Sequence, residues 1–191
     1  EGKLYSAQAK LQFKLGNYEE SLEYAGKAIE KLKQSPDSSS LELMSVLGKE
    51  IEVLIELCKF NTAKTKIKEL EELLTTKLNS EVHLIEPYYW YGYFYFYTDD
   101  DSKSKEYFGK ALDLIARYWR GNYSRKAQIY NFMGKLEAIQ GKLKASFEYY
   151  HQALAINEAI FGKDHPNTMA VYAFLGDSYR EDGNVKKAES I

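Results

Sequence analysis

QGKLKASFEYYHQAL, residues 140 to 154, decides how the rest of the chain is interpreted, because its pattern occurs elsewhere in the sequence. A glycine is followed by a polar residue, by an apolar or aromatic residue and, three positions further on, by a small residue. The same order appears in LGNYEESLEYAGKAI, residues 15 to 29, and in DGNVKKAES, residues 182 to 190. Recurrence at a fixed period of about 20 to 50 residues indicates stacked structural repeats.

The glycines of these segments give the period. Gly141 and Gly183 are 42 residues apart, and this spacing predicts further junctions near residues 58 and 99 and at Gly16. The segments KFNTAKTKIKEL (59 to 70) and DDSKSKEYFGKAL (100 to 112) fit the two projected positions. We therefore expect five junctions, at intervals of 42, 41, 42 and 42 residues.

Residues on both sides of each junction suit a pair of closely packed helices. Apolar residues recur at spacings of three and four, as in Leu143, Phe147, Tyr150 and Leu154, which predicts helices. The small residues after the junctions would let two helices approach to about 8–10 Å; they are Ser21, Ala63, Ser104, Ser146 and Ala188. Upstream of three junctions a large residue precedes a glycine by four positions, in the pairs Tyr88/Gly92, Tyr130/Gly134 and Tyr172/Gly176. The sequence thus predicts an all-α array of antiparallel helix hairpins.

We expect one such array over residues 1–191, with repeats at about 3–36, 41–79, 82–119, 122–161 and 165–191. The last repeat is expected to be incomplete, so Tyr172, Leu175 and Tyr179 are expected to be partly uncovered. We expect that either the chain continues beyond Ile191 or copies self-associate through this uncapped C-terminal end.

The stretch PYYWYGYFYFY, residues 87 to 97, falls on the first helix of the third hairpin. A half-buried strand would alternate aromatic with polar residues, and a membrane span needs about 20 apolar residues. Neither fits. On a helix, one set of rings faces the hairpin core, and a second set lies on a different flank: Tyr89, Tyr93, Phe96 and Tyr97.

Composition excludes several classes of function. The net charge of −2 and pI near 6.0 give no basic footprint for nucleic acid, and no membrane partner is expected. His83, His151 and His165 are far apart, and we find no metal-ligand or phosphate-binding motif. We expect no cofactor, no metal and no enzymatic activity.

Cys58, the single cysteine, is interpreted as a small core residue in a reducing compartment, and a cytoplasmic location is expected.

The repeated helix-hairpin segments resemble the tetratricopeptide repeat (TPR) family over nearly the whole chain. The match is strongest between Tyr130 and Ala188. The period is longer than the usual 34, and the segment GKDHPNTMAVYAFLGDSYREDGNVKKAES (162 to 190) is similar to the long-repeat class of kinesin light chains. The resemblance implies a right-handed superhelical solenoid of about five hairpins.

The family resemblance also implies a function. The first helices of such arrays line a concave groove that binds a peptide or protein without chemistry. Carried over by register, the groove would include seven candidate peptide-binding residues: Tyr89, Tyr93, Phe96, Tyr97, Asn131, Lys135 and Arg180. Asn131 and Lys135 are expected to meet a ligand backbone amide and a carboxylate. The alternative for the tyrosines is packing against neighbouring hairpins.

We therefore expect a protein–protein interaction scaffold that binds a peptide segment of a partner in its groove. Two alternatives stay open: a peptide-sensing regulatory domain of a larger regulator, and an accessory interaction domain of a multidomain enzyme.

Overall fold

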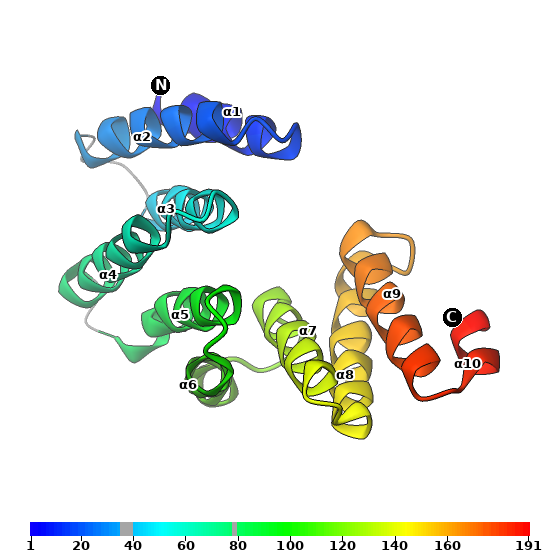
Figure 1. The fold of residues 1–191 in the computed structure, drawn as a ribbon. Coiled ribbons are helices and arrows are strands. Elements are labelled where there is room, and N and C mark those ends of the chain that lie inside the picture. Colours follow the sequence, from blue (N-terminus) through cyan, green and yellow to red (C-terminus); the bar gives the residue numbers. More distant parts are fainter. Residues whose placement is uncertain (35–39, 78–79) are drawn as a thin grey trace. The chain divides into compact units, whose positions relative to one another are not determined.

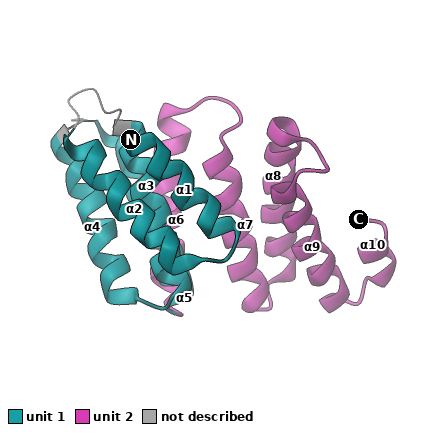
Figure 2. Ribbon diagram, turned by 90° about the horizontal axis from the view of Figure 1, so that it is seen from above, with its two compact units in different colours: residues 1–98 teal, residues 99–191 magenta. Residues whose placement is uncertain are grey.

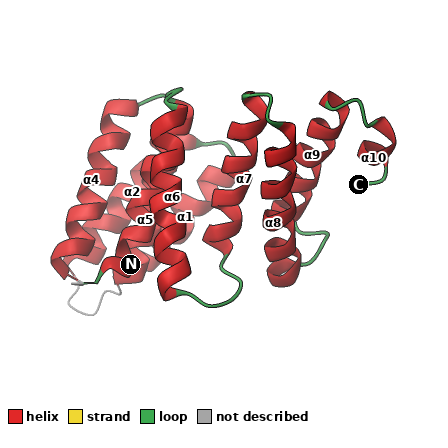
Figure 3. Ribbon diagram, turned by 90° about the horizontal axis from the view of Figure 1, so that it is seen from below, coloured by secondary structure: helices red, strands yellow, loops and turns green. Residues whose placement is uncertain are grey.

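The structure is a computed structural model and describes residues 1–34, 40–77 and 80–191. In this part of the chain all regular secondary structure is helical (Figures 1 and 3). The helices are α1 (Gly2–Lys14), α2 (Tyr18–Gln34), α3 (Ser40–Glu56), α4 (Phe60–Lys77), the 3-10 helix η1 (Glu81–Leu84), α5 (Ile85–Tyr97), α6 (Asp101–Tyr118), α7 (Ser124–Ile139), α8 (Leu143–Phe161), α9 (Pro166–Glu181) and α10 (Val185–Glu189). The all-α prediction is confirmed.

All five predicted junctions adopt the same backbone conformation. Gly16, Gly141 and Gly183 have φ angles of 79°, 71° and 76°, in the left-handed region that glycine enters without strain. Cys58 and Asp99, at the two projected junctions, have φ angles of 55° and 57°. The turn geometry therefore follows the period even where glycine is absent.

Four of the five small residues after the junctions are buried where a first helix meets a second helix. Ser21, Ala63, Ser104 and Ser146 are each 0% exposed. Ser21 Oγ donates a hydrogen bond to the carbonyl oxygen of Ala9, 2.8 Å away, and so satisfies its hydroxyl inside the first hairpin. These four residues lie at close helix contacts as predicted, whereas Ala188 is half-buried.

The chain forms two compact units, residues 1–98 and 99–191 (Figure 2). In the first unit, α1 contacts α3 and α3 contacts α5, so these first helices are neighbours. The second helices α2 and α4 each pack against the first helices on either side of them. The largest fully buried side chains of this unit are aliphatic and include Leu43, Leu47, Ile51, Ile55, Ile67, Leu70 and Leu74.

The second unit repeats this arrangement with α6 to α10. Helices α7 and α9 are neighbouring first helices, and α8 packs against both. Between them lies a core of buried residues that comprises Tyr150, Ala153, Leu154, Val171, Leu175 and Tyr179. Close contact between α7 and α8 depends on Gly134, because a Cβ there would lie 2.7 Å from Cε1 of Tyr150.

Two expectations from the sequence are wrong. Tyr172 is half-buried as expected, but Leu175 and Tyr179 are 1% and 5% exposed rather than partly uncovered. Helix α10 packs on α9, and the Phe147 ring stacks on that of Tyr179 at 4.3 Å. Cys58 is exposed rather than in the core, because it occupies the turn between α3 and α4.

Candidate functional site

The predicted tyrosines of α5 form a row within the first unit. The ring centroids of Tyr89 and Tyr93 are 6.1 Å apart, and those of Tyr93 and Tyr97 are 4.8 Å apart. Exposure rises along the row, from 4% and 5% at Tyr89 and Tyr93 to 40% at Tyr97. Phe96 is half-buried, with its ring 5.3 Å from that of Tyr97. Tyr97 is therefore the member of the row most open to a ligand.

The carboxylates of Glu52 and Glu56 on α3 lie near Tyr97, at the exposed end of this row. Tyr93 Oη donates a hydrogen bond to Glu56 Oε1 over 3.2 Å. Burial raises the pKa of the Tyr97 hydroxyl, and the negative charges of Glu56 and Glu52 raise it further. Burial likewise raises the pKa of Tyr93 far above its ordinary value. Both hydroxyls are therefore neutral hydrogen-bonding groups at physiological pH.

Lys135 of α7 lies against aromatic rings of the second unit. Its Nζ is 3.9 Å from the ring centroid of Phe174 on α9 and 5.0 Å from that of Phe132. No carboxylate among the described residues lies within ion-pair distance of this ammonium. Burial lowers the pKa of Lys135, because its charged form has lost part of its hydration.

Asn131, one helical turn before Lys135, lines a pocket of about 180 Å³ between α7, α8 and α9. Its Oδ1 is buried and accepts no hydrogen bond from the described residues. The remaining lining residues are Ser124, Ala127, Gln128, Asn157, Phe161, Asn167, Ala170 and Val171. A buried polar group without a partner costs about 1–3 kcal/mol in proteins. Asn131 Oδ1 is therefore available to accept a hydrogen bond from a ligand.

Arg180 lies in the last turn of α9 and is exposed. Its Nη2 forms an ion pair with Asp177 Oδ1 at 2.7 Å, one turn earlier on the same helix. Surface pairs of this kind are worth about 0–1 kcal/mol, so the guanidinium can exchange partners easily. Asn131, Lys135 and Arg180 thus belong to the two neighbouring first helices of one unit.

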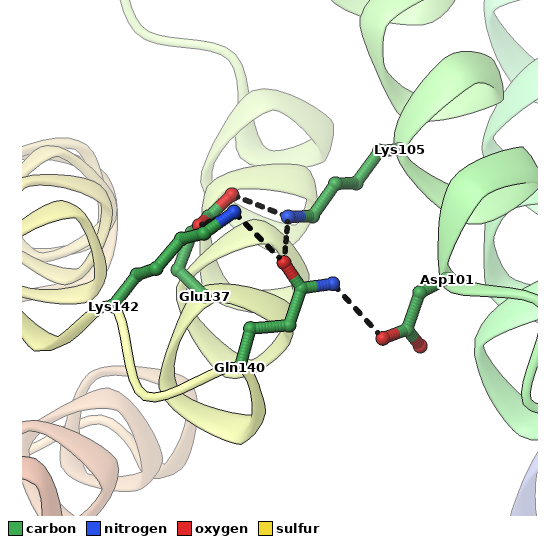
Figure 4. Close-up of polar contacts among 5 residues, drawn as sticks. All are labelled: Asp101, Lys105, Glu137, Gln140 and Lys142. Atoms are coloured by element: carbon green, nitrogen blue, oxygen red, sulfur yellow. Dashed lines mark hydrogen bonds and ion pairs between the residues drawn. The ribbon is translucent and has the colours of Figure 1, made fainter.

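A polar network links α6 to α7 (Figure 4). Lys105 Nζ donates hydrogen bonds to Glu137 Oε1 at 2.6 Å and to Gln140 Oε1 at 2.9 Å. The amide of Gln140 donates in turn to Asp101 Oδ2, and Lys142 donates to Gln140 Oε1. Because the hydrogen-bonding groups of these five side chains bind one another, we infer that the network holds α6 and α7 together rather than binding a ligand.

Reasoning from the sequence missed Asn157 and Phe174. Asn157 sits in the buried seam of α8, 5% exposed, and its Nδ2 donates to the carbonyl oxygen of Asn167. An asparagine directly after the apolar run ALAI, residues 153 to 156, was the available signal. Phe174 was not assigned a role because its contact with Lys135 joins two repeats.

No group of three or more His, Cys, Asp or Glu side chains that could hold a metal ion occurs in residues 1–34, 40–77 and 80–191. Over the same residues, every helix is too short or too polar to cross a membrane.

Paired helices, left-handed turns at a 42-residue period and neighbouring first helices define a helical-hairpin repeat protein. Two family models, both described as tetratricopeptide repeat, match the chain, one at residues 2–30 and 85–118 and the other at residues 125–191. The chain belongs to the tetratricopeptide repeat family. No curated protein sequence matches it significantly.

Solved structures share the fold at low sequence identity. A Rap protein complexed with Competence and Sporulation Factor has a TM-score of 0.77 and 18% identity, over 97% of this chain and 50% of that chain. A putative kinesin light chain from Podosopora anserina has a TM-score of 0.64 and 12% identity, over 98% of this chain and 89% of that one.

A third similar structure is the Signal Transduction ATPase with Numerous Domains protein PH0952 from Pyrococcus horikoshii, which has a tetratricopeptide repeat sensor. Its TM-score is 0.69 at 16% identity, over 97% of this chain and 27% of that chain. The present chain therefore spans about half of the Rap protein and about a quarter of PH0952.

Proposed function

We propose that this chain is a protein-interaction scaffold whose first helices form a concave groove for a peptide segment of a partner. Its family membership supports an interaction role. The partner we propose is a protein rather than nucleic acid, since the chain carries a net charge of −2. The role is binding without catalysis, and its setting is the cytoplasm, where the exposed Cys58 thiol would stay reduced.

The observation that carries this proposal is the position of Lys135. Its ammonium is partly removed from water, rests on Phe174 and has no carboxylate partner among the described residues. A charge that has lost hydration gains most from an incoming opposite charge. We therefore propose that Lys135 binds a carboxylate of the peptide, a side chain or the C-terminus, while Asn131 and Arg180 provide neighbouring polar contacts.

In the first unit, Tyr97 and Phe96 would provide the aromatic contact area. A tyrosine supplies a large rigid surface with a polar tip, which suits peptide recognition. Because Tyr89 and Tyr93 are buried, we propose that they contribute mainly by supporting Tyr97 through the row of rings.

The test begins with selection of random peptides displayed on phage against the whole chain. Affinity for the best selected peptide is then measured by fluorescence anisotropy. Lys135→Met keeps the aliphatic stem over Phe174 and removes the charge, and we expect about tenfold weaker binding, which corresponds to about 1.4 kcal/mol. Lys163→Met, at an exposed turn lysine, is the control and should bind as the wild type does. Equal affinity of all three proteins would refute the role of Lys135.

A second candidate function is peptide sensing within a larger regulator. It is favoured by the similarity to the Rap protein that was crystallised with Competence and Sporulation Factor. The similarity to the repeat sensor of PH0952 equally suits an accessory domain of a larger enzyme. Limited proteolysis of the native full-length protein, with and without a selected peptide, separates the candidates. A regulator predicts that the peptide changes cleavage outside residues 1–191, whereas a simple scaffold predicts no such change.

We also propose that copies of the chain associate through the face formed by α8, α9 and α10. A groove of about 430 Å³ lies there, lined in part by Leu154, Ala155 and Ile191. Sedimentation equilibrium should reveal a dimer that Ala155→Glu dissociates, because Ala155 is exposed and its replacement would add a charge to the groove. A monomer at all concentrations would exclude this association.

A further inference from the structure

The pocket between α7, α8 and α9 is lined by neutral residues throughout. Five of the residues around its volume of about 180 Å³ carry polar side chains: Ser124, Gln128, Asn131, Asn157 and Asn167. An apolar cavity of about 150 Å³ is large enough for one benzene molecule, so this pocket has room for one ligand side-chain group. It lies within the second unit and is built from three of its helices.

Hydrogen bonds within the protein fix which atoms of the lining remain available. Asn157 uses its Nδ2 to donate to the carbonyl oxygen of Asn167 at 3.3 Å, which leaves Asn157 Oδ1 as an acceptor. Gln128 uses its Oε1 to accept from Arg125 Nη1 at 2.6 Å, which leaves Gln128 Nε2 as a donor. Asn131 makes no side-chain hydrogen bond to a described residue, so its amide offers both a donor and an acceptor.

The wall of the pocket that α9 forms is held in place by contacts at the start of that helix. The backbone N–H of Asn167 donates to His165 Nδ1 at 3.2 Å, and Thr168 Oγ1 donates to the carbonyl oxygen of Gly162 at 2.8 Å. The Phe161 ring, which lines the pocket, stacks on the His165 ring at 4.5 Å. These contacts fix the pocket wall before a ligand arrives, which reduces the entropy lost on binding.

The available atoms discriminate between classes of ligand group. A carboxylate only accepts hydrogen bonds, so it could accept from the amides of Gln128 and Asn131, but it would leave Asn131 Oδ1 without a donor and would face Asn157 Oδ1. An ammonium only donates, would find no counter-charge in the lining, and would approach the Arg125 guanidinium behind Gln128. A primary carboxamide both donates and accepts, and it can form two hydrogen bonds with the amide of Asn131.

We propose that this pocket binds the carboxamide side chain of an asparagine or glutamine residue in the peptide ligand. The inference rests on the proposed peptide-binding function and deepens it, because it names the side chain that this part of the surface selects. Asn131 forms the paired amide contact, Asn157 accepts from the ligand amide, and Gln128 donates to the ligand carbonyl.

A small-molecule titration tests the pocket without any peptide. The uniformly ¹⁵N-labelled chain is titrated with propionamide and, separately, with propionate, which has the same shape and no donor. The side-chain amide signals of Asn131 are assigned by their absence in Asn131→Ala. We expect propionamide to shift them saturably and propionate to do so at least tenfold more weakly. Absence of a saturable shift with propionamide, or equal responses to both compounds, would overturn the proposal.

Peptide selection provides the second measurement. Random peptides selected on the wild-type chain should be enriched in Asn or Gln at one position, and selection on Asn131→Ala should lose that enrichment. Asn61→Ala, at an exposed asparagine of α4, is the matched control and should keep it. Peptides that bind without any preference for Asn or Gln would contradict the pocket proposal and leave the peptide-binding function intact. If no peptide is selected, the proposed function fails, and the propionamide titration still decides the pocket.

Discussion

Gly134 of α7 lies directly against the ring of Tyr150 on α8, so that an added Cβ would be 2.7 Å from Tyr150 Cε1. Tyr150 is 2% exposed and packs within the core between α8 and α9. Alanine gains helix propensity over glycine by about 0.5–1 kcal/mol, but overpacking costs about 1–3 kcal/mol. We therefore expect Gly134→Ala to lower the free energy of unfolding by about 1 kcal/mol, measured by urea denaturation.

Gly176 provides the matched control, because it occupies the equivalent position of the next repeat. A Cβ there would meet only the carbonyl oxygen of Ala188 at 3.9 Å, an ordinary contact distance. Gly176→Ala should leave stability unchanged or raise it. If both alanine variants are stable, the close approach of α7 and α8 at Gly134 is not a constraint.

The left-handed junction at Cys58 predicts a stabilising substitution. An L-residue in this conformation costs about 1–2 kcal/mol, whereas the extra chain entropy of an unfolded glycine costs about 0.5–1 kcal/mol. Cys58→Gly should therefore raise the free energy of unfolding by about 0.5 kcal/mol. Gly141→Ala, at a junction with φ of 71°, should lower it by about 1 kcal/mol. Thermal and urea denaturation measure both, and a less stable Cys58→Gly protein would argue against the strained turn.

Glu50 predicts a pH dependence of stability. Burial raises the pKa of this α3 carboxyl, and the ion pair with Lys66 of α4 at 3.3 Å opposes the rise only in part. A raised pKa means that the folded chain holds this proton more tightly than the unfolded chain. The resulting stability is present in full below pH 4.5 and is lost as the pH rises through the folded-state pKa. Relative to wild type, Glu50→Gln should therefore gain stability as the pH rises through this window.

Asp100 predicts the opposite slope. Its side chain accepts hydrogen bonds from Lys103 at the start of α6, and these lower the pKa of the carboxyl. Its contribution to stability is present above pH 3.8 and is lost as the pH falls through the folded-state pKa. Asp100→Asn, which keeps an oxygen at the cap, should flatten this acid limb. Unfolding free energies measured in urea across both windows would contradict these assignments if the two variants change in the same direction.

The Lys105–Glu137 pair predicts a positive coupling energy. Glu137 is 9% exposed, so Lys105→Met alone would leave a largely buried carboxylate without its closest cation. Each single replacement, Lys105→Met or Glu137→Leu, should cost about 2 kcal/mol, and the double variant should cost less than their sum. Urea denaturation of the four proteins measures the coupling. Strict additivity would show that the network in Figure 4 does not link α6 to α7 energetically.

The fold was predictable because a repeat places the same demand on every copy. Gly16, Gly141 and Gly183 gave the period, and the period located the turns at Cys58 and Asp99, where no glycine marks them. The burial of Cys58 was predicted wrongly. Its apolar neighbours favour a core position, but Cys58 itself occupies the exposed turn at a junction. That residues 1–191 form one array stays a prediction, since the chain divides into two compact units.

The site was less predictable, because exposure depends on contacts between repeats that a helical periodicity does not specify. The register put Tyr89, Tyr93 and Tyr97 on one flank, yet only Tyr97 is substantially exposed. The pocket residues Asn131 and Asn157 lie in one repeat and Asn167 lies in the next, so no local motif in the sequence indicates the set. Which of the seven candidate residues bind a peptide stays a prediction.

The turn at Cys58 also makes the chain convenient for spectroscopy. Its only sulfhydryl faces solvent between α3 and α4, so one maleimide fluorophore or spin label attaches there without any engineered replacement. The attachment point lies just after Glu56, which accepts a hydrogen bond from Tyr93. A dye at this position would register ligand arrival beside Tyr97 as a change in emission from the natural sequence.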